Sequence, residues 1–70
     1  MSKTRRDVMP KIESQRASIR EHIDKYNRYP HDRDKKFALD TISGCQERIS
    51  TLKYQCSQDI PYSWEDTWTP

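Results

Sequence analysis

The sequence has few of the residues that build tight turns or membrane spans. It contains one glycine among 70 residues, so a meander of tight-turned strands, which needs residues that tolerate positive φ, is not expected. No apolar run approaches the length of a membrane span or of the apolar segment of a signal peptide. These absences favour a helical, cytoplasmic protein that has no contact with a membrane.

Cysteine is equally scarce, with two residues, Cys45 and Cys56. Eleven positions on one helix separate them by about 16 Å. That separation is far beyond the reach of an intrachain disulfide. We expect reduced thiols that fill a core, with pairing across an oligomer interface as the alternative.

The charged residues are numerous and unevenly distributed. They make up 34% of the chain against 31% for hydrophobic residues, which places the sequence between a small helical domain and a disordered segment, and the lack of glycine argues against disorder. Residues 1–30 carry eight basic and four acidic side chains, whereas residues 57–70 carry three acidic and no basic ones. The two ends can attract each other or steer a partner.

Apolar residues from Val8 to Tyr26 recur at steps of four, seven, four and three, which is typical of one face of a helix. We predict this helix over residues 7–27, with Asp7 as its N-cap. Asn27 can close the helix in a left-handed conformation, and the proline at position 30 prevents its continuation.

A second helix is predicted over residues 32–56. From Ile42 onward its apolar residues follow steps of three, four, three and four, the rhythm of a helix packed lengthwise against another. Gly44 interrupts this helix, and a close approach of two helices is one reason for a glycine there. The short linker predicts an all-α fold, an antiparallel two-helix hairpin. A basic lead-in, residues 1–6, precedes it, and an acidic-aromatic tail, residues 57–70, follows it.

A lone hairpin would leave its apolar seam half uncovered, and about a dozen core residues do not offset the entropy of ordering some fifty residues. Either a second copy, giving a helical-bundle homodimer, or the tail must cover the seam. The residues expected to form the oligomer core are Ile12, Ile19, Ile23, Leu39, Ile42, Cys45, Ile49 and Leu52.

Both tryptophans lie in the tail, four residues apart, so one helical turn would place them on the same side. Ser63 can cap that turn with Asp66 at the capping-box position. The turn is either a lid on its own hairpin or an anchor for a partner's groove, and both interpretations bury the indoles. The predicted partner-binding residues are Tyr62, Trp64, Glu65, Asp66 and Trp68.

Motifs for catalysis or cofactor binding are absent from the sequence, which has no glycine-rich phosphate loop, paired-cysteine motif or nucleophile elbow. His22 and His31 lie in different segments with no other ligands at metal spacing. We therefore expect no enzyme activity, no cofactor, no catalytic residues and no metal site.

A basic strip near the amino end could contact nucleic acid phosphates without reading sequence. Acidic residues are interleaved with it, as on an ordinary solvated helix face, so this alternative is not favoured. Its residues would be Lys3, Arg5, Arg6, Arg16 and Arg20.

The stretch IESQRASIREHIDKYNRYP, residues 12–30, together with the two-helix plan, resembles small helical accessory proteins encoded in early regions of lambdoid phages. The resemblance implies a regulatory, non-enzymatic role in the host cytoplasm, directed at a host protein. The segment IPYSW, residues 60–64, resembles the turn before the carboxyl-terminal tryptophan of Hha-type nucleoid-modulating proteins, although this tail is acidic where theirs is basic. That resemblance implies a basic face that meets an acidic nucleoid protein.

The favoured hypothesis is a small homodimeric adaptor or modulator that binds another protein. The alternatives are a nucleic-acid-binding hairpin dimer or an Hha-like modulator. A protein-binding surface at the loop end, around Tyr29, His31 and Phe37, is a further possibility.

Overall fold

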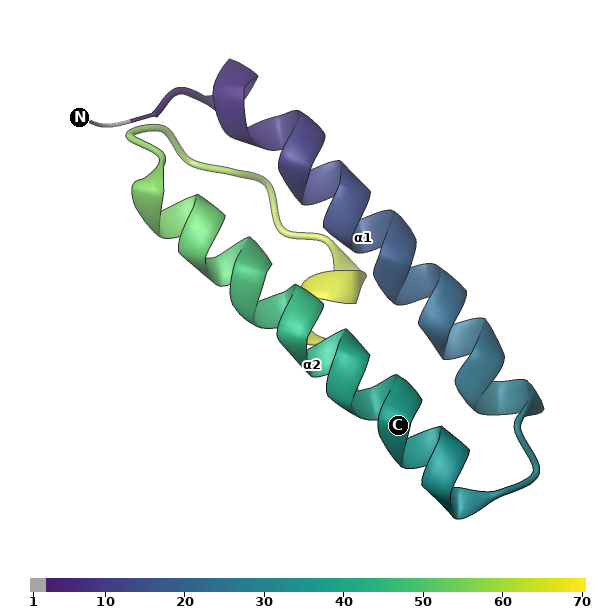
Figure 1. Ribbon diagram of the computed structural model, residues 1–70. Coiled ribbons are helices and arrows are strands. Elements are labelled where there is room, and N and C mark those ends of the chain that lie inside the picture. The colour runs from purple at the N-terminus through teal and green to yellow at the C-terminus, as the bar shows by residue number, and fades with distance from the viewer. Residues whose placement is uncertain (1–2) are drawn as a thin grey trace.

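The computed structural model describes residues 3–70 and contains two long antiparallel helices (Figure 1). Helix α1 spans Arg5–Arg28, helix α2 spans Asp32–Gln55, and a short 3-10 helix, η1, spans Trp64–Thr67. The predicted all-helical hairpin is confirmed. Residues 5 and 6 of the expected lead-in already belong to α1, and residues 1 and 2 lie outside the described residues. None of the helices described has the length and apolar character needed to cross a membrane.

Helix α1 begins and ends at residues other than those predicted. Thr4 is the N-cap, and its backbone N–H donates to Oδ2 of Asp7 over 3.1 Å, so Asp7 closes a capping box rather than capping the helix. Asn27 stays helical, and no residue of the described range has a positive φ. Tyr29 ends the helix in extended backbone, φ −72° and ψ 131°, because a residue that precedes proline avoids the helical region.

The core is the seam between the helices. Ile23, Cys45, Cys56, Ile60 and Trp68 are partly buried against it, Leu39 is half-buried, and both thiols are free. The residues that form the core itself are buried, and they are Val8, Ile12, Ile19, Ile42, Ile49 and Leu52. The heptad pattern of α2 therefore identified its buried face correctly.

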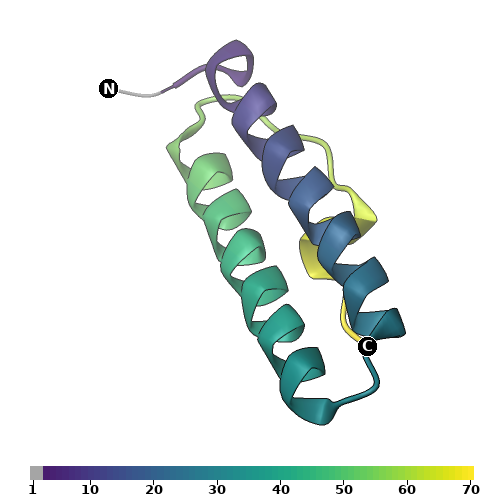
Figure 2. The same ribbon diagram turned by 45° about the vertical axis from the view of Figure 1, so that its right-hand side comes forward.

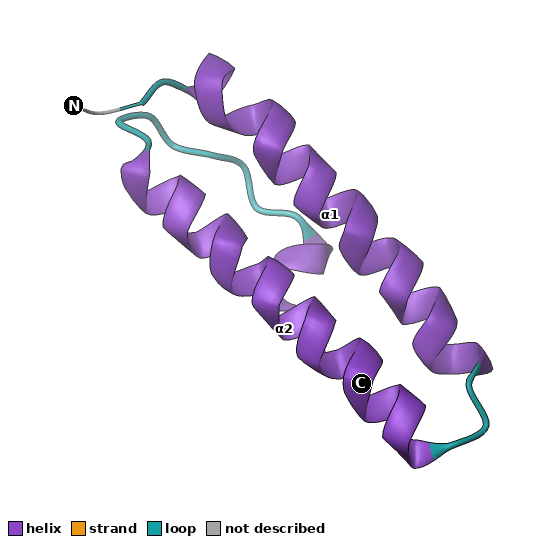
Figure 3. Cartoon of the chain, in the orientation of Figure 1, coloured by secondary structure: helices purple, strands orange, loops and turns teal. Residues whose placement is uncertain are grey.

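The tail after α2 turns back and runs along one side of both helices, placing η1 across them (Figures 1 and 2). Its start is attached to Lys3, just before α1. The Lys3 N–H donates to the Gln55 carbonyl and the Ser57 N–H donates to the Lys3 carbonyl, both over 2.9 Å. The tail is thus a lid on its own hairpin, connected by a loop without regular structure (Figure 3). Of the two covers considered for the seam, a second copy or the tail, the structure shows the tail, whose Ile60 and Trp68 pack against the core.

Gly44 does not mark a close approach of the two helices. A Cβ built at Gly44 would meet no described heavy atom within 4 Å outside its own helix and chain neighbours. The explanation offered by the sequence pattern is therefore wrong, and nothing in the described residues replaces it.

Candidate functional site

Arg16 is the centre of the contacts that hold the tail. It lies on α1 between Ile12 and Ile19 and is only 4% exposed. Its Nε donates to Oδ1 of Asp66 over 2.9 Å and its Nη2 to Oδ2 over 2.8 Å, a bidentate pair. Nη2 also donates to the Pro61 carbonyl over 2.9 Å, so a single side chain of α1 binds two points of the tail.

Asp66 receives further donors from α2 and from the tail itself. Lys53 Nζ donates to Oδ2 over 2.8 Å, and the Ser63 N–H donates to the same oxygen over 3.2 Å. The second contact is the predicted capping box of the tail, which is confirmed. One carboxylate thereby links both helices to η1.

Glu65 is the other buried acid of the tail, at 3% exposure. Arg20 Nη1 donates to its Oε2 over 2.5 Å, and the Ser63 hydroxyl donates to its Oε1. Gln46 Nε2 donates to the Glu65 carbonyl over 3.0 Å and to the Trp68 carbonyl over 2.9 Å. We call the seven residues whose side chains make these contacts the tail clamp: Arg16, Arg20, Gln46, Lys53, Ser63, Glu65 and Asp66.

The clamp changes the protonation of its acids. Burial alone would raise the pKa of Asp66, but hydrogen bonds from Arg16, Lys53 and the Ser63 backbone outweigh it and lower this pKa to about 2. Burial likewise opposes the change at Glu65, whose pKa is lowered by hydrogen bonds from Ser63, its own backbone and Arg20. The hydrogen bond to Asp66 raises the pKa of the Arg16 guanidinium. Asp66, Glu65 and Arg16 are therefore all charged near neutral pH.

Acid is expected to loosen the tail. The pKa of Asp66 falls from 3.8 to about 2 on folding, so its contribution is complete above about pH 4 and is lost as the pH falls through about 2. For a side chain that is 6% exposed, the loss in the free energy of unfolding is about 2 kcal/mol. Urea unfolding between pH 6 and pH 2 measures it. Asp66→Asn should flatten this decline, and an equally steep decline in that variant would contradict the assignment.

The two tryptophans have different environments. Trp68 packs against the core and meets Tyr26 edge to face, with ring centroids 6.1 Å apart and an interplanar angle of 77°. Trp64 is 50% exposed and Tyr62 is 66% exposed. The two indoles do not share one side of a helical turn, because η1 is a 3-10 helix with three residues per turn and Trp68 follows its last residue. Trp68 packs as the lid interpretation predicts, whereas Trp64 stays exposed on this chain.

The predicted partner-binding set therefore divides into two groups. Glu65, Asp66 and Trp68 make contacts within the chain, and their role in meeting a partner stays a prediction. Tyr62 and Trp64 remain exposed, and the Tyr62 hydroxyl lies 2.7 Å from Oγ1 of Thr67. We call these two residues the aromatic patch.

No protein-family model matches this chain, and comparisons with curated proteins and with solved structures find no match. The likenesses to phage accessory proteins and to Hha-type modulators remain predictions.

The basic residues predicted to contact nucleic acid do not form one exposed strip. Arg16 is buried, and its guanidinium donates to Asp66 and to the Pro61 carbonyl of the tail and to Glu13 of α1, which removes it from any contact with phosphate in this conformation. Arg20 is paired with Glu65. Arg5 and Arg6 are exposed and Lys3 is half-buried.

The other candidate features stay apart in the structure. His22 Nδ1 lies 2.8 Å from the Ser18 carbonyl, and His31 is exposed before α2. In residues 3–70 no three His, Cys, Asp or Glu side chains are close enough to hold a metal ion. At the loop end Phe37 is 74% exposed and Tyr29 is half-buried.

The sequence reasoning missed the role of Arg16 and of Gln46. A signal for Arg16 was present, because it is four residues after Ile12 and three before Ile19 and so falls on the apolar face. A cation at such a position needs an acidic partner from elsewhere in the chain. The tail could supply that partner, because residues 57–70 carry three acidic and no basic side chains.

Proposed function

We propose that this chain is a small non-enzymatic protein-binding module whose contact surface is the aromatic patch. The observation that carries the proposal is that Tyr62 and Trp64 stay exposed on a segment held in place by buried charged groups. A few residues contribute most of the binding energy of a protein interface, and tyrosine and tryptophan are enriched among them. Because the tail is already ordered, little conformational entropy is lost when a partner binds.

The tail clamp holds the backbone on which Tyr62 and Trp64 lie. Asp66 and Arg16 hold η1, and Pro61, the residue before Tyr62, is held through its carbonyl by the same arginine. A complementary partner would offer an apolar pocket for the indole of Trp64 and a hydrogen-bond acceptor or donor for the Tyr62 hydroxyl. The homodimer expected from the sequence is a separate proposal, which sedimentation equilibrium of the whole chain tests.

Removing the aromatic patch should abolish partner capture while leaving the fold intact. From a lysate of the source organism, the tagged Tyr62→Ala/Trp64→Ala variant should capture about tenfold less of the specific partner than the unmodified chain does, or less still. The reason is that two hot-spot residues are lost. Quantitative mass spectrometry of the captured proteins measures this loss. Circular dichroism should show an unchanged helical content, because neither side chain belongs to the core.

Tyr54→Ala is the matched control. Tyr54 is 91% exposed on α2, so its removal deletes a similar aromatic surface outside the patch. It should leave capture unchanged. Equal loss of the partner in both variants, or full capture by the double variant, would rule out the proposed surface.

A further inference from the structure

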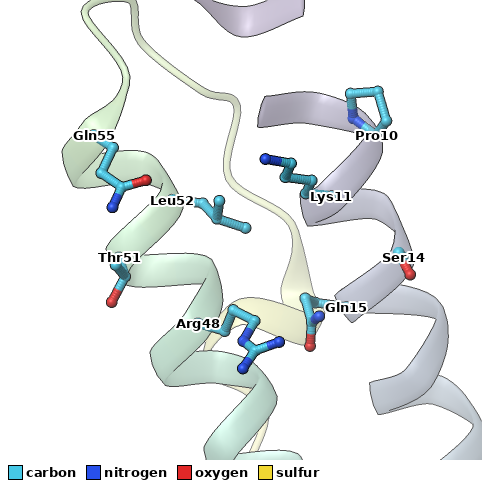
Figure 4. Close-up of a pocket in the computed structure, with 8 residues that line it drawn as sticks. All are labelled: Pro10, Lys11, Ser14, Gln15, Arg48, Thr51, Leu52 and Gln55. Carbon is cyan, nitrogen blue, oxygen red and sulfur yellow. The ribbon is translucent and has the colours of Figure 1, made fainter. Parts of the chain in front are cut away.

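The hairpin has a second groove on the side away from the tail. It lies between α1 and α2 and encloses about 510 Å³. Figure 4 shows the side chains of Lys11 and Gln15 reaching from α1 toward those of Leu52 and Arg48 on α2, with the tail ribbon behind them. We call this the open groove, and its lining residues are Pro10, Lys11, Ser14, Gln15, Arg48, Thr51, Leu52 and Gln55.

The contacts of the tail with the opposite side of the hairpin show what kind of segment the two helices can hold. There a cation from each helix, Arg16 and Lys53, meets an acid of the tail, and Gln46 holds the tail backbone, while Trp68 packs on the apolar seam. The segment held there, the tail of this chain, is acidic and aromatic and has no long regular structure.

The open groove carries the same kinds of groups. Lys11 comes from α1 and Arg48 from α2, and Gln15 and Gln55 lie beside them. Leu52, the one buried core residue among those that line it, supplies an apolar surface. The two sides of the hairpin are therefore chemically alike, but in the described structure only one of them holds a peptide segment.

The open groove is lined by two cations and by no acidic residue. Lys11 and Arg48 are the only charged residues there, both are exposed, and neither joins an ion pair among residues 3–70. Lys11 acts on Asp7 only weakly: the pKa of Asp7 is lowered chiefly by hydrogen bonds from Thr4 and in smaller part by Lys11. A ligand with carboxylates would satisfy both cations.

We propose that the open groove binds an acidic-aromatic peptide segment of a protein partner, as a second contact surface beyond the aromatic patch. Its carboxylates would meet Lys11 and Arg48, and an aromatic side chain would cover Leu52. Two cations beside an apolar surface suit such a peptide better than nucleic acid, whose binding depends on neutralising many phosphates. Two observations support this proposal: the groove has two cations without acidic partners, and the opposite side of the same hairpin holds an acidic-aromatic segment.

The test uses the full chain and a synthetic peptide with the sequence of residues 57–70 as a probe of this chemistry. Titration followed by amide NMR shifts should perturb Gln15, Leu52 and Gln55. Lys11→Glu/Arg48→Glu should weaken binding at least about tenfold. Lys11→Ala/Arg48→Ala, a milder change, should weaken it less. Arg33→Glu/Lys36→Glu is the matched control, because it makes the same change of net charge at exposed residues outside the groove and should bind as the unmodified chain does.

Four outcomes would overturn the proposal. One is no binding at peptide concentrations up to about 1 mM. Another is perturbation confined to Arg16 and Gln46, which would mean that the probe only replaces the tail. The third is an equal loss of binding in the Arg33→Glu/Lys36→Glu control. The last is binding of single-stranded DNA, and not of the peptide, with the same dependence on Lys11 and Arg48.

Discussion

Replacing Arg16 by alanine is expected to lower the free energy of unfolding by about 3–5 kcal/mol. The side chains of Arg16 and Asp66 are 5% and 6% exposed, so the substitution leaves a buried carboxylate without its bidentate partner. Lys53 still contacts that carboxylate, but through one oxygen only. The Pro61 carbonyl also loses its donor. A domain of this size has a total stability of about 4–10 kcal/mol. The loss expected for Arg16→Ala is therefore a large part of the total free energy of unfolding.

Urea denaturation followed by far-ultraviolet circular dichroism and by tryptophan emission measures this effect. Arg28→Ala is the matched control, because it also removes an arginine of α1 paired with an aspartate, Asp24, but both side chains are more than 60% exposed. It should cost less than about 1 kcal/mol. Equal losses for the two arginines would show that burial of the Arg16 pair contributes nothing.

A double substitution separates the two possible causes of the loss. If the unpaired carboxylate is responsible, Arg16→Met/Asp66→Leu should recover most of the stability lost in Arg16→Ala, since apolar residues can replace a buried ion pair at little cost. If the double variant is as unstable as the single one, the hydrogen bond to the Pro61 carbonyl and the packing of the guanidinium stem carry the effect.

The features that depend on local sequence were predictable. The periodic apolar residues located both helices, because a helix exposes one stripe to its neighbour regardless of what lies further away. Pro30 determined where the first helix ends, and Ser63 with Asp66 located the turn in the tail. Each of these signals acts within four residues.

The features that depend on distant partners were not predictable in detail. The sequence shows acids in the tail and cations in α1, but Arg16 and Asp66 are 50 positions apart and nothing local pairs them. The helix type of the tail decided which indole is buried, and the sequence gives no reason to choose a 3-10 turn over an α-helical one for so few residues. The candidate site follows from these two non-local facts.

Removing the tail is expected to abolish cooperative folding. A chain that ends at Cys56 lacks Ile60 and Trp68, which pack against the core, and leaves Arg16 without the tail carboxylate. Two helices with half of their apolar face in water do not offset the entropy of ordering the chain. Circular dichroism at micromolar concentration should show reduced helicity and no sigmoidal thermal transition.

Restoring the missing surface should restore the fold. A peptide of residues 57–70 added to the truncated chain should recover helicity in proportion to its concentration, whereas the same peptide with Asp66→Asn and Trp68→Ala should not, because it lacks the carboxylate for Arg16 and the ring for Tyr26. A truncated chain that regains helicity by itself at high concentration, and sediments as a dimer, would show that a second copy can replace the tail. A truncated monomer with a cooperative transition would instead show that the seam is stable uncovered, and the tail clamp would then have to be explained by the presentation of Tyr62 and Trp64 alone.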